Sequence, residues 1–310
     1  MNESKKVIVE QVFPALVDFR AFIFKNYTKY LRPLPGLGSL PNGLSLYNAL
    51  LEFHTSVKGT KASDLHNLGL KEVQRLKCEL MSLVVNDLAQ ANATFSTFAE
   101  GIKNKQDYNS SQAMLDYFEC IITAIEPRLA NLFREPVLTQ DTYNLQVFAV
   151  PPGGRGGIAF YMSPSVDGRR TGAFFVNANN LTNVRRFEVH TLTLHEGNPG
   201  HHLQLNYLTQ RSPLPNFLKY PGPSTFGNPL TYNGHIEGWG LYAEYLGNEM
   251  NMFADPMRKI GYLSMNLLRA GRLVVDTGIH AFDWSRQKAI DYLADNTLMS
   301  MPAIEAEIDR

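Results

Sequence analysis

The stretch His195-Glu196-Gly197-Asn198-Pro199-Gly200-His201-His202 brings together the residue types that bind zinc and use it. A neutral imidazole is a common zinc ligand, and a carboxylate beside a ligand can take a proton from water that the metal activates. We therefore expect His195 to be a metal ligand and Glu196 to be the catalytic general base. The alternative, a helix end whose histidines bind no metal, leaves the clustering of three histidines and a glutamate unexplained.

The second ligand is ambiguous because a proline interrupts the usual spacing. Zinc-binding histidines on one helical face are commonly four residues apart, but the residue four after His195 is Pro199. Proline removes a helical hydrogen bond and collides with the preceding turn, so we expect the helix to kink or stop. His202 lies about two regular turns after His195 and would face the same way. His201 fits if the chain breaks at Gly200, and the proline favours it; both stay candidate metal ligands.

A second motif, Glu-Gly-Trp-Gly-Leu-Tyr-Ala-Glu at 237–244, begins 42 residues after His195. Glu237 and Glu244 are seven residues apart and so share one helical face. We expect Glu237 to be the third metal ligand and Glu244 to orient a ligand histidine through its other ring nitrogen. A solvated acidic face is the alternative, but the residues between the two glutamates are too apolar for it. Tyr242 is a candidate substrate contact.

A third motif ends in Asp276-Thr277-Gly278-Ile279-His280. Asp276 and His280 lie four residues apart and can pair on one helical face, which would fix the tautomer of the imidazole. His280 could then act as a catalytic residue that stabilises a developing oxyanion. A buried structural Asp–His pair explains the same spacing, so both interpretations stay open.

The elements that must position these residues are mostly helical, because apolar residues recur at steps of three and four. The predicted helical segments are 7–30, 70–89, 111–125 and, with breaks, 186–310. Between about 143 and 178, three short β-branched and aromatic runs separated by Gly and Pro predict a small antiparallel sheet. The Pro-rich stretch 212–229 is predicted to be a long loop.

The predicted fold is therefore mainly α, with one small antiparallel sheet beside the helices of the site. We expect one catalytic-type domain over residues 1–310. In it, 1–135 is helical, 136–180 forms the sheet, and 181–310 is helical and carries the metal site. We also expect the strand near 173–177 to pair with substrate backbone as an added strand, with Asn177 contacting substrate.

Composition excludes other classes of function. Lys+Arg and Asp+Glu both number 29, so there is no basic surface to attract nucleic acid or anionic lipid. No apolar run reaches the roughly 20 residues of a membrane span. Two cysteines cannot build a disulfide framework. The first residues lack the apolar region of a secretory signal, which makes the cytoplasm the default compartment. Five Asn-x-Ser/Thr sites keep a secretory or lysosomal parent protein open. The oligomeric state also stays open.

These motifs together resemble those of the domain-of-unknown-function 885 proteins, within the group of zinc peptidases whose third ligand is glutamate. The resemblance covers most of the chain. Its blocks, in order, are 40–43, 54–55, 66–70, 167–168, 195–204, 237–244 and 272–280. It implies a helical zinc-peptidase-like fold around a deep cleft and one zinc ion near His195 and Glu237. Family members are usually much longer, so the chain would lack most of an N-terminal half and the extreme C-terminus.

We therefore expect a zinc-dependent hydrolase, a metallopeptidase that cleaves short peptides. Zinc would lower the pKa of a water molecule, and Glu196 would take its proton and pass it to the leaving amine. One alternative is a truncated, inactive relative that serves as a binding or scaffold module. Another is a zinc hydrolase that acts on amides or esters other than peptides.

Overall fold

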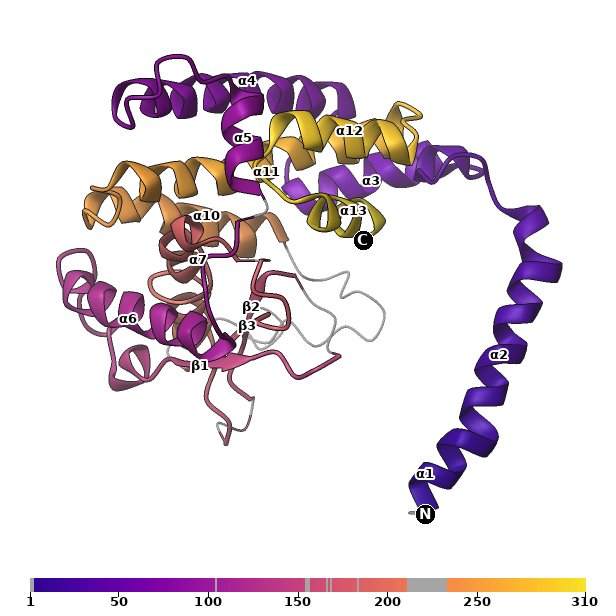
Figure 1. Ribbon diagram of the computed structural model, residues 1–310, viewed down its shortest axis with the longest axis horizontal. Coiled ribbons are helices and arrows are strands. Elements are labelled where there is room, and N and C mark those ends of the chain that lie inside the picture. Colours follow the sequence, from indigo (N-terminus) through magenta and orange to yellow (C-terminus); the bar gives the residue numbers. More distant parts are fainter. Residues whose placement is uncertain are drawn as a thin grey trace.

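The computed structural model shows a mainly helical protein with one small sheet, which confirms the predicted fold class (Figure 1). The described residues are 3–103, 105–153, 157–165, 167, 169–182, 184–210 and 233–310. The stretch 212–229, predicted to be a loop, lies outside them. None of the helices in the described ranges is long and apolar enough to cross a membrane.

Helices fill the first part of the chain, and a sheet and further helices follow. The first elements are α1 Glu3–Val7, η1 Ile8–Val12, α2 Phe13–Phe22, η2 Ile23–Tyr27, η3 Thr28–Tyr30, η4 Leu37–Ser39, α3 Gly43–Thr55, α4 Ala62–Asn86, α5 Phe95–Lys103 and α6 Ser111–Leu129. The middle elements are η5 Gln140–Tyr143, β1 Gln146–Ala149, β2 Ala159–Met162 and β3 Ala173–Val176. The last are η6 Arg186–Glu188, α7 Val189–Glu196, α8 His201–Gln210, α10 Asn233–Glu249, α11 Pro256–Ala281, α12 Arg286–Asn296 and α13 Met301–Asp309.

The two longest helices, α4 and α11, pack against each other and share an apolar core. The α4 side of this core consists of Val73, Leu76, Leu80 and Val84, whose steps of three and four residues predicted the helix. The α11 side includes Ile260, Leu263, Leu267 and Ala270. Burial of an aliphatic side chain of this size stabilises the fold by roughly 2 kcal/mol. The α11 helix, which carries the third sequence motif, is thereby held rigidly.

A second core joins α6 to the sheet and to α7. Phe118 of α6 meets Phe174 of β3 edge to face, with ring centroids 5.3 Å apart, and both side chains are fully buried. The same cluster contains Leu192 and Leu194 of α7. Because α7 packs on this core, the His195-Glu196 motif at its end has a fixed support.

The sheet has the strand order β1-β3-β2 and is mixed, so the predicted antiparallel arrangement is wrong for one of its two pairs. β2 pairs with β3 antiparallel, but β1 pairs with β3 parallel. Strands that alternate in direction along the chain give an antiparallel sheet only when neighbours in sequence are neighbours in space. Here β3 lies between the other two and therefore runs in the same direction as β1.

The central place of β3 also contradicts the expectation that it pairs with a substrate. Both of its edges already bond to neighbouring strands, so its backbone has no free edge for an added strand. The outer edges of the sheet belong to β1 and β2.

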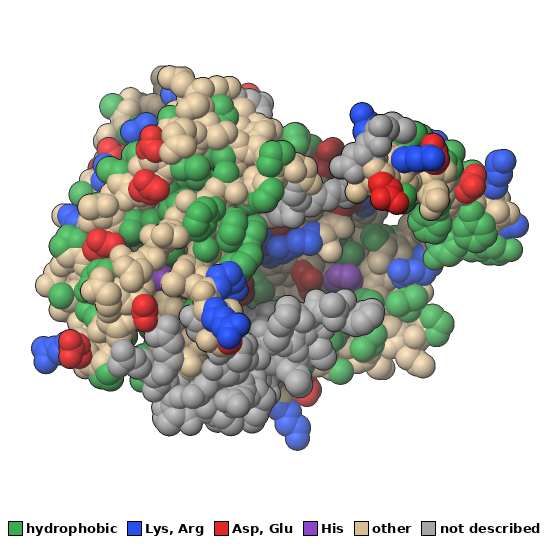
Figure 2. Space-filling view, turned by 90° about the horizontal axis from the view of Figure 1, so that it is seen from below, with side chains coloured by type: hydrophobic (Ala, Val, Ile, Leu, Met, Phe, Trp, Pro, Cys, Tyr) green, Lys and Arg blue, Asp and Glu red, His purple; other side chains and the backbone are tan. Residues whose placement is uncertain are grey.

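Residues 3–30 form a helical segment that projects from the body of the protein (Figure 1). Its apolar side chains are exposed, and Figure 2 shows them gathered on the part of the surface that stands apart from the body. Phe13, Leu16, Phe19 and Phe24 are each at least 60% exposed. The predicted helix therefore forms, but its apolar side chains do not contribute to the core.

Candidate metal centre

The motif 195–202 spans the end of one helix and the start of the next. α7 ends at Glu196 and α8 begins at His201, so the helix is interrupted at Pro199 as predicted. The four residues between the helices are held by side chains: Asn198 Nδ2 donates to the Thr142 carbonyl at 2.7 Å, and Trp239 Nε1 donates to the Pro199 carbonyl at 2.8 Å. A Cβ on Gly200 would lie 1.9 Å from the His195 carbonyl oxygen, so only glycine fits there.

The break brings His195 and His201 together, and α10 adds Glu237. One ligand atom from each of the three residues lies within 4.8 Å of the other two. His195 Nε2 is 3.3 Å from one Glu237 carboxylate oxygen, and His201 Nε2 is 3.9 Å from the other. Both histidines are buried, whereas the Glu237 side chain is 60% exposed. The cluster therefore opens to solvent on the side of the carboxylate.

The geometry of these donors fits a zinc ion. Zinc bonds of about 2.0–2.1 Å in a tetrahedron place two ligand atoms about 3.3 Å apart, close to the separations above. His195 Nδ1 donates to Glu244 Oε1 at 2.8 Å, and His201 Nδ1 donates to Gln204 Oε1 at 3.3 Å. With both Nδ1 atoms bonded to neighbours, the two Nε2 atoms are the ones left to bind a metal ion, His195 Nε2 once it has lost its proton. Two imidazoles and a carboxylate with an open fourth side are the donor set of a catalytic zinc site.

The approach of α10 to His195 depends on Gly240. A Cβ at this position would lie 2.4 Å from His195 Cε1, closer than any carbon contact allows. Gly240 therefore lets the helix that carries Glu237 and Glu244 lie directly against the imidazole.

Glu244 supports His195 from behind and is itself held by Arg269 of α11. The Glu244 side chain is fully buried, and Arg269 Nη2 lies 2.7 Å from the carboxylate oxygen that His195 contacts. A buried carboxylate is costly unless it is paired, and Arg269 supplies the countercharge. The placement matches the role expected for Glu244, an acceptor for the ring nitrogen that faces away from the metal.

The charges at the site show what a metal would replace. Burial lowers the pKa of His195, but hydrogen bonds to Glu237 and Glu244 outweigh it and raise the pKa to about 9. The His195 hydrogen bond lowers the pKa of Glu237 to about 2. Burial lowers the pKa of His201. The site therefore combines an ionised carboxylate, a neutral imidazole and a proton on His195 that a metal ion would displace.

Glu196 lies at the edge of the same cluster, against the sheet. Its carboxylate accepts a hydrogen bond of 2.9 Å from the backbone N–H of Tyr161 on the outer edge of β2. Burial raises the pKa of Glu196 to about 7, with His195 lowering it and Glu237 raising it. A carboxyl group that titrates near neutral pH suits a general base.

His202 does not join the metal cluster, which corrects its place among the candidate ligands. Its Nε2 donates to the Asp141 carbonyl at 3.0 Å, and its Nδ1 accepts from the Tyr161 hydroxyl at 3.1 Å. Burial lowers the pKa of His202 to about 4, so the ring is neutral. A regular helix through 195–202 would have aligned His202 with His195, but the break at Pro199 turns α8 so that His201 takes that place.

Asp276 and His280 lie on the same helix as Arg269 but outside the cluster. Asp276 Oδ1 accepts from the Tyr47 hydroxyl at 2.5 Å, and His280 Nδ1 accepts from the backbone N–H of Leu37 at 3.0 Å. His280 Nε2 lies 3.9 Å from Asp276 Oδ2. Arg269 and His280 are separated by eleven residues, about 16 Å along the helix. The contacts that the structure gives to the pair hold α3 and η4 against α11.

The two candidate substrate residues lie in different surroundings. The side chain of Asn177 accepts a hydrogen bond from the backbone N–H of Asn179 at 3.4 Å, just after β3. Tyr242 is 51% exposed on α10 and stacks on Tyr245, with ring centroids 6.2 Å apart. Tyr242 therefore presents an aromatic face to solvent one turn beyond Glu237.

Two participants have no sequence signal of their own. Arg269 lies 25 residues after Glu244, and nothing in its local pattern marks it as the countercharge of that carboxylate. The contact of Tyr161 with Glu196 is made by its backbone, which is the same for every residue type except proline.

Fold and site together define a helical class of protein with a His-His-Glu cluster beside a small sheet. The entire chain, residues 1–310, matches the model of one family, described as "Bacterial protein of unknown function (DUF885)". The chain belongs to this family. No curated protein matches it.

Several solved structures resemble the chain, and two of them are described here. One is described as "the putative lipoprotein from Colwellia psychrerythraea"; it is 28% identical, with a TM-score of 0.81, over 98% of this chain and 51% of that chain. The other, "a putative lipoprotein of unknown function from Shewanella oneidensis", is 16% identical, with a TM-score of 0.64, over 98% of this chain and 53% of that chain. The second shows the fold alone. The chain spans about half the length of the solved structures that it matches.

Proposed function

We propose that the protein is a zinc-dependent hydrolase that cleaves peptide bonds. The observation that carries the proposal is the convergence of His195 Nε2, His201 Nε2 and the Glu237 carboxylate, whose ligand atoms all lie within 4.8 Å. Three protein ligands with an exposed side leave room for water and substrate. A histidine pair and a glutamate, each supported by a hydrogen-bonded neighbour, serve no evident packing purpose.

In this proposal, each residue around the cluster has a separate role in hydrolysis. His195, His201 and Glu237 would hold the zinc ion, which would supply Lewis-acid activation of a water molecule. Glu196 accepts the proton of the attacking water and transfers it to the leaving amine. The N–H of Tyr161 holds one oxygen of the Glu196 carboxylate, which leaves the other oxygen for proton transfer. Glu244 and Arg269 keep the His195 ring in place during the reaction.

The sheet supports a peptide as substrate. Tyr161 directs its N–H away from β3 and towards Glu196, so the outer edge of β2 borders the reacting groups. An extended peptide that pairs with a free strand edge gains backbone hydrogen bonds regardless of its sequence. On this proposal, the aromatic face of Tyr242 and Tyr245 lies on the opposite, α10 side of the site.

The test is Glu196→Gln, which keeps the shape and the Tyr161 contact but removes the base. We expect zinc content to stay near one per chain while hydrolysis of a mixed peptide library falls at least about 100-fold, the typical contribution of a general base. His201→Ala should instead lose zinc. Hydrolysis at the original rate by Glu196→Gln would refute the mechanism, and a chain without stoichiometric zinc would refute the site.

The alternative is an inactive relative that acts as a binding or scaffold module. The chain aligns with about half of each of these two solved structures, so an activity of the whole proteins does not by itself carry over to this chain. Zinc binding without turnover of peptides, amides or esters by this chain would support the alternative. Turnover by this chain would exclude it.

The description of the 28% identical relative as a putative lipoprotein favours the cell envelope over the cytoplasm as the location of this protein. Fractionation of the cells in which the protein occurs naturally tests this: recovery in the envelope fraction would support the proposal, and recovery in the cytoplasmic fraction would contradict it.

A further inference from the structure

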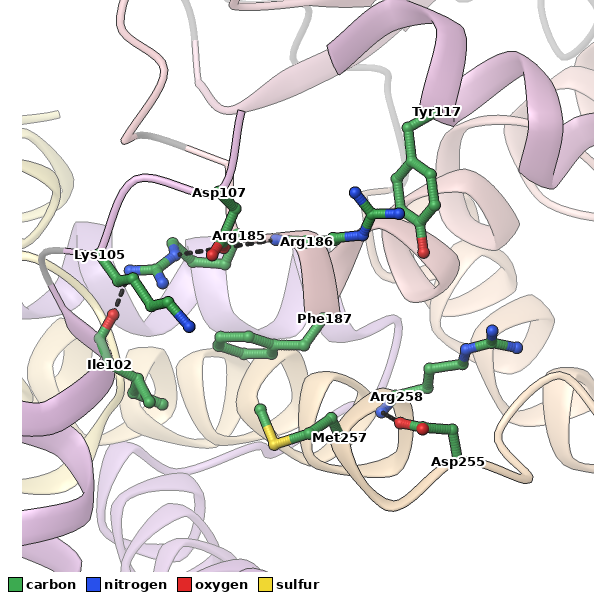
Figure 3. Close-up of a pocket in the computed structure, with 10 residues that line it drawn as sticks. All are labelled: Ile102, Lys105, Asp107, Tyr117, Arg185, Arg186, Phe187, Asp255, Met257 and Arg258. Atoms are coloured by element: carbon green, nitrogen blue, oxygen red, sulfur yellow. Dashed lines mark hydrogen bonds and ion pairs between the residues drawn. The ribbon is translucent and has the colours of Figure 1, made fainter. Parts of the chain in front are cut away.

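A pocket of about 340 Å³ lies at the start of α11, away from the metal cluster. Its wall consists of the end of α5, the connection to α6, η6 and the first turn of α11 (Figure 3). None of the residues that line it belongs to the metal cluster. The volume lies within the range of pockets that bind small molecules, roughly 300–1,000 Å³.

The pocket carries an excess of positive charge in a chain whose formal net charge is zero. Its charged lining residues are Lys105, Arg185, Arg186 and Arg258, with Asp107 and Asp255 opposing them. The buried Arg185 pairs with Asp107 at 3.1 Å, so these two charges cancel. Three cations then face one carboxylate, an excess of two positive charges.

The free cations are placed on a rigid frame. The backbone N–H of Arg186 donates to Asp107 at 2.9 Å, and its guanidinium lies over the Tyr117 ring, 4.1 Å from the centroid. The backbone N–H of Arg258 donates to Asp255 at 3.1 Å. Among the described residues, neither guanidinium has an ion-pair partner. Figure 3 shows both side chains extending on the same side of Phe187.

Apolar side chains complete the lining of the pocket. Phe187 is buried and 8% exposed, and Ile102 and Met257 beside it are partly buried. The cations reach a common region of the protein. Burial, followed by the charge of Arg258 and, more weakly, of Arg186, lowers the pKa of buried His190 to about 4.

From this arrangement we propose that the pocket binds a small organic anion, with one phosphate or carboxylate group attached to a flat apolar group. The planar guanidinium of arginine matches the oxygens of either anion with paired hydrogen bonds. Stacking on Tyr117 fixes the Arg186 guanidinium before the ligand arrives, which lowers the entropy lost on binding. Phe187 and Met257 take the apolar group. This site is independent of the metal cluster and of the proposed hydrolysis.

Phenyl phosphate is the probe, and calorimetric titration of the full chain at low ionic strength is the assay. We expect saturable binding of one phenyl phosphate per chain, which weakens as salt screens the charges. Arg186→Gln and Arg258→Gln should each weaken it at least about tenfold, the effect of losing one charge-assisted hydrogen bond. Arg134→Gln removes an exposed arginine outside the pocket and should leave binding unchanged.

Three further measurements separate this site from others. The methyl resonance of Met257 in the parent chain should shift on addition of phenyl phosphate. This measurement needs no variant, so it does not depend on how well a variant folds. Binding should be equal with and without a zinc chelator, because a phosphate bound to zinc would depend on the metal. Inorganic phosphate should bind at least about tenfold more weakly, because it leaves the apolar side chains of the pocket uncovered.

The proposal is overturned if phenyl phosphate shows no saturable binding, or if Arg134→Gln weakens binding as much as the pocket variants. It is also overturned if the chelator abolishes binding, which would place the probe at the metal. Equal affinity for inorganic phosphate would overturn the assignment of an organic ligand.

Discussion

Replacing Arg269 by glutamine should destabilise the protein and weaken its hold on zinc at the same time. Arg269 neutralises Glu244, a fully buried carboxylate whose other partner in the described part of the chain is His195. Removing one partner of a buried ion pair costs about 3–5 kcal/mol of unfolding free energy. Because the Arg269 side chain is 19% exposed, we expect the lower end, about 3 kcal/mol.

The effect on zinc follows from the same contacts. Without Arg269, Glu244 has lost the group that fixes its position, so the His195 ring is less well oriented. Loss of such a supporting partner typically lowers metal affinity by about 10- to 100-fold. We therefore expect a drop of this size in competition against a chromophoric chelator.

A double-mutant cycle with Glu244→Gln isolates the charge. Glutamine at 244 keeps an oxygen for His195 Nδ1 and removes the buried charge that Arg269 must neutralise. The double variant should therefore be more stable than the sum of the two single variants predicts, by about 2 kcal/mol in urea unfolding of the metal-free chain.

The matched control is Arg75→Gln, which breaks a pair with Glu72 at the exposed surface of α4. Such surface pairs contribute about 0–1 kcal/mol. Unfolding free energies of Arg269→Gln and Arg75→Gln that agree within error, with unchanged zinc affinity, would refute the reasoning.

Two further predictions concern single buried side chains. His202→Ala should cost about 2 kcal/mol of stability, because it removes the hydrogen bonds to Tyr161, Asp141 and Asn206 and leaves a cavity. Metal analysis should still find one zinc per chain, and loss of zinc would return His202 to the ligand set. Burial raises the pKa of Glu188 to about 7. Because this pKa is raised in the folded state, the stability that protonated Glu188 gives is complete below pH 4.5 and declines until about pH 7. The difference of 2.5 pKa units corresponds to about 3 kcal/mol. Glu188→Gln should remove that decline when the free energy of unfolding of the metal-free chain is measured in urea at several pH values. If the free energies of the variant and of the parent chain change with pH in parallel, the prediction is contradicted.

Local patterns in the sequence predicted the helices, because the spacing of residues such as Val73 and Leu76 depends only on helical geometry. The order of the strands was not predictable in this way. Whether β3 inserts between β1 and β2 is decided by packing between segments distant in sequence, and the short apolar runs are equally compatible with a meander.

In the candidate site, too, local sequence predicted some features, and contacts between distant segments decide the others. Pro199 predicted the break, and the break alone favoured His201, but the orientation of α8 after a non-helical link depends on distant anchors such as Thr142 and Trp239. Arg269 escaped prediction because its role arises only when α11 packs beside α10. The ligand set of His195, His201 and Glu237 stays a prediction until zinc is measured.

The placement of Glu237 on a different helix from His195 gives a bound zinc ion a second consequence. The two residues are 42 positions apart, so a metal that joins them acts on the unfolded chain as a cross-link. Closing a loop of this length reduces chain entropy by an amount worth about 4 kcal/mol at 25 °C. The zinc ion, proposed above to take part in catalysis, would thus also stabilise the fold as a cross-link between α7 and α10. A chelator would then lower the melting temperature as well as the activity.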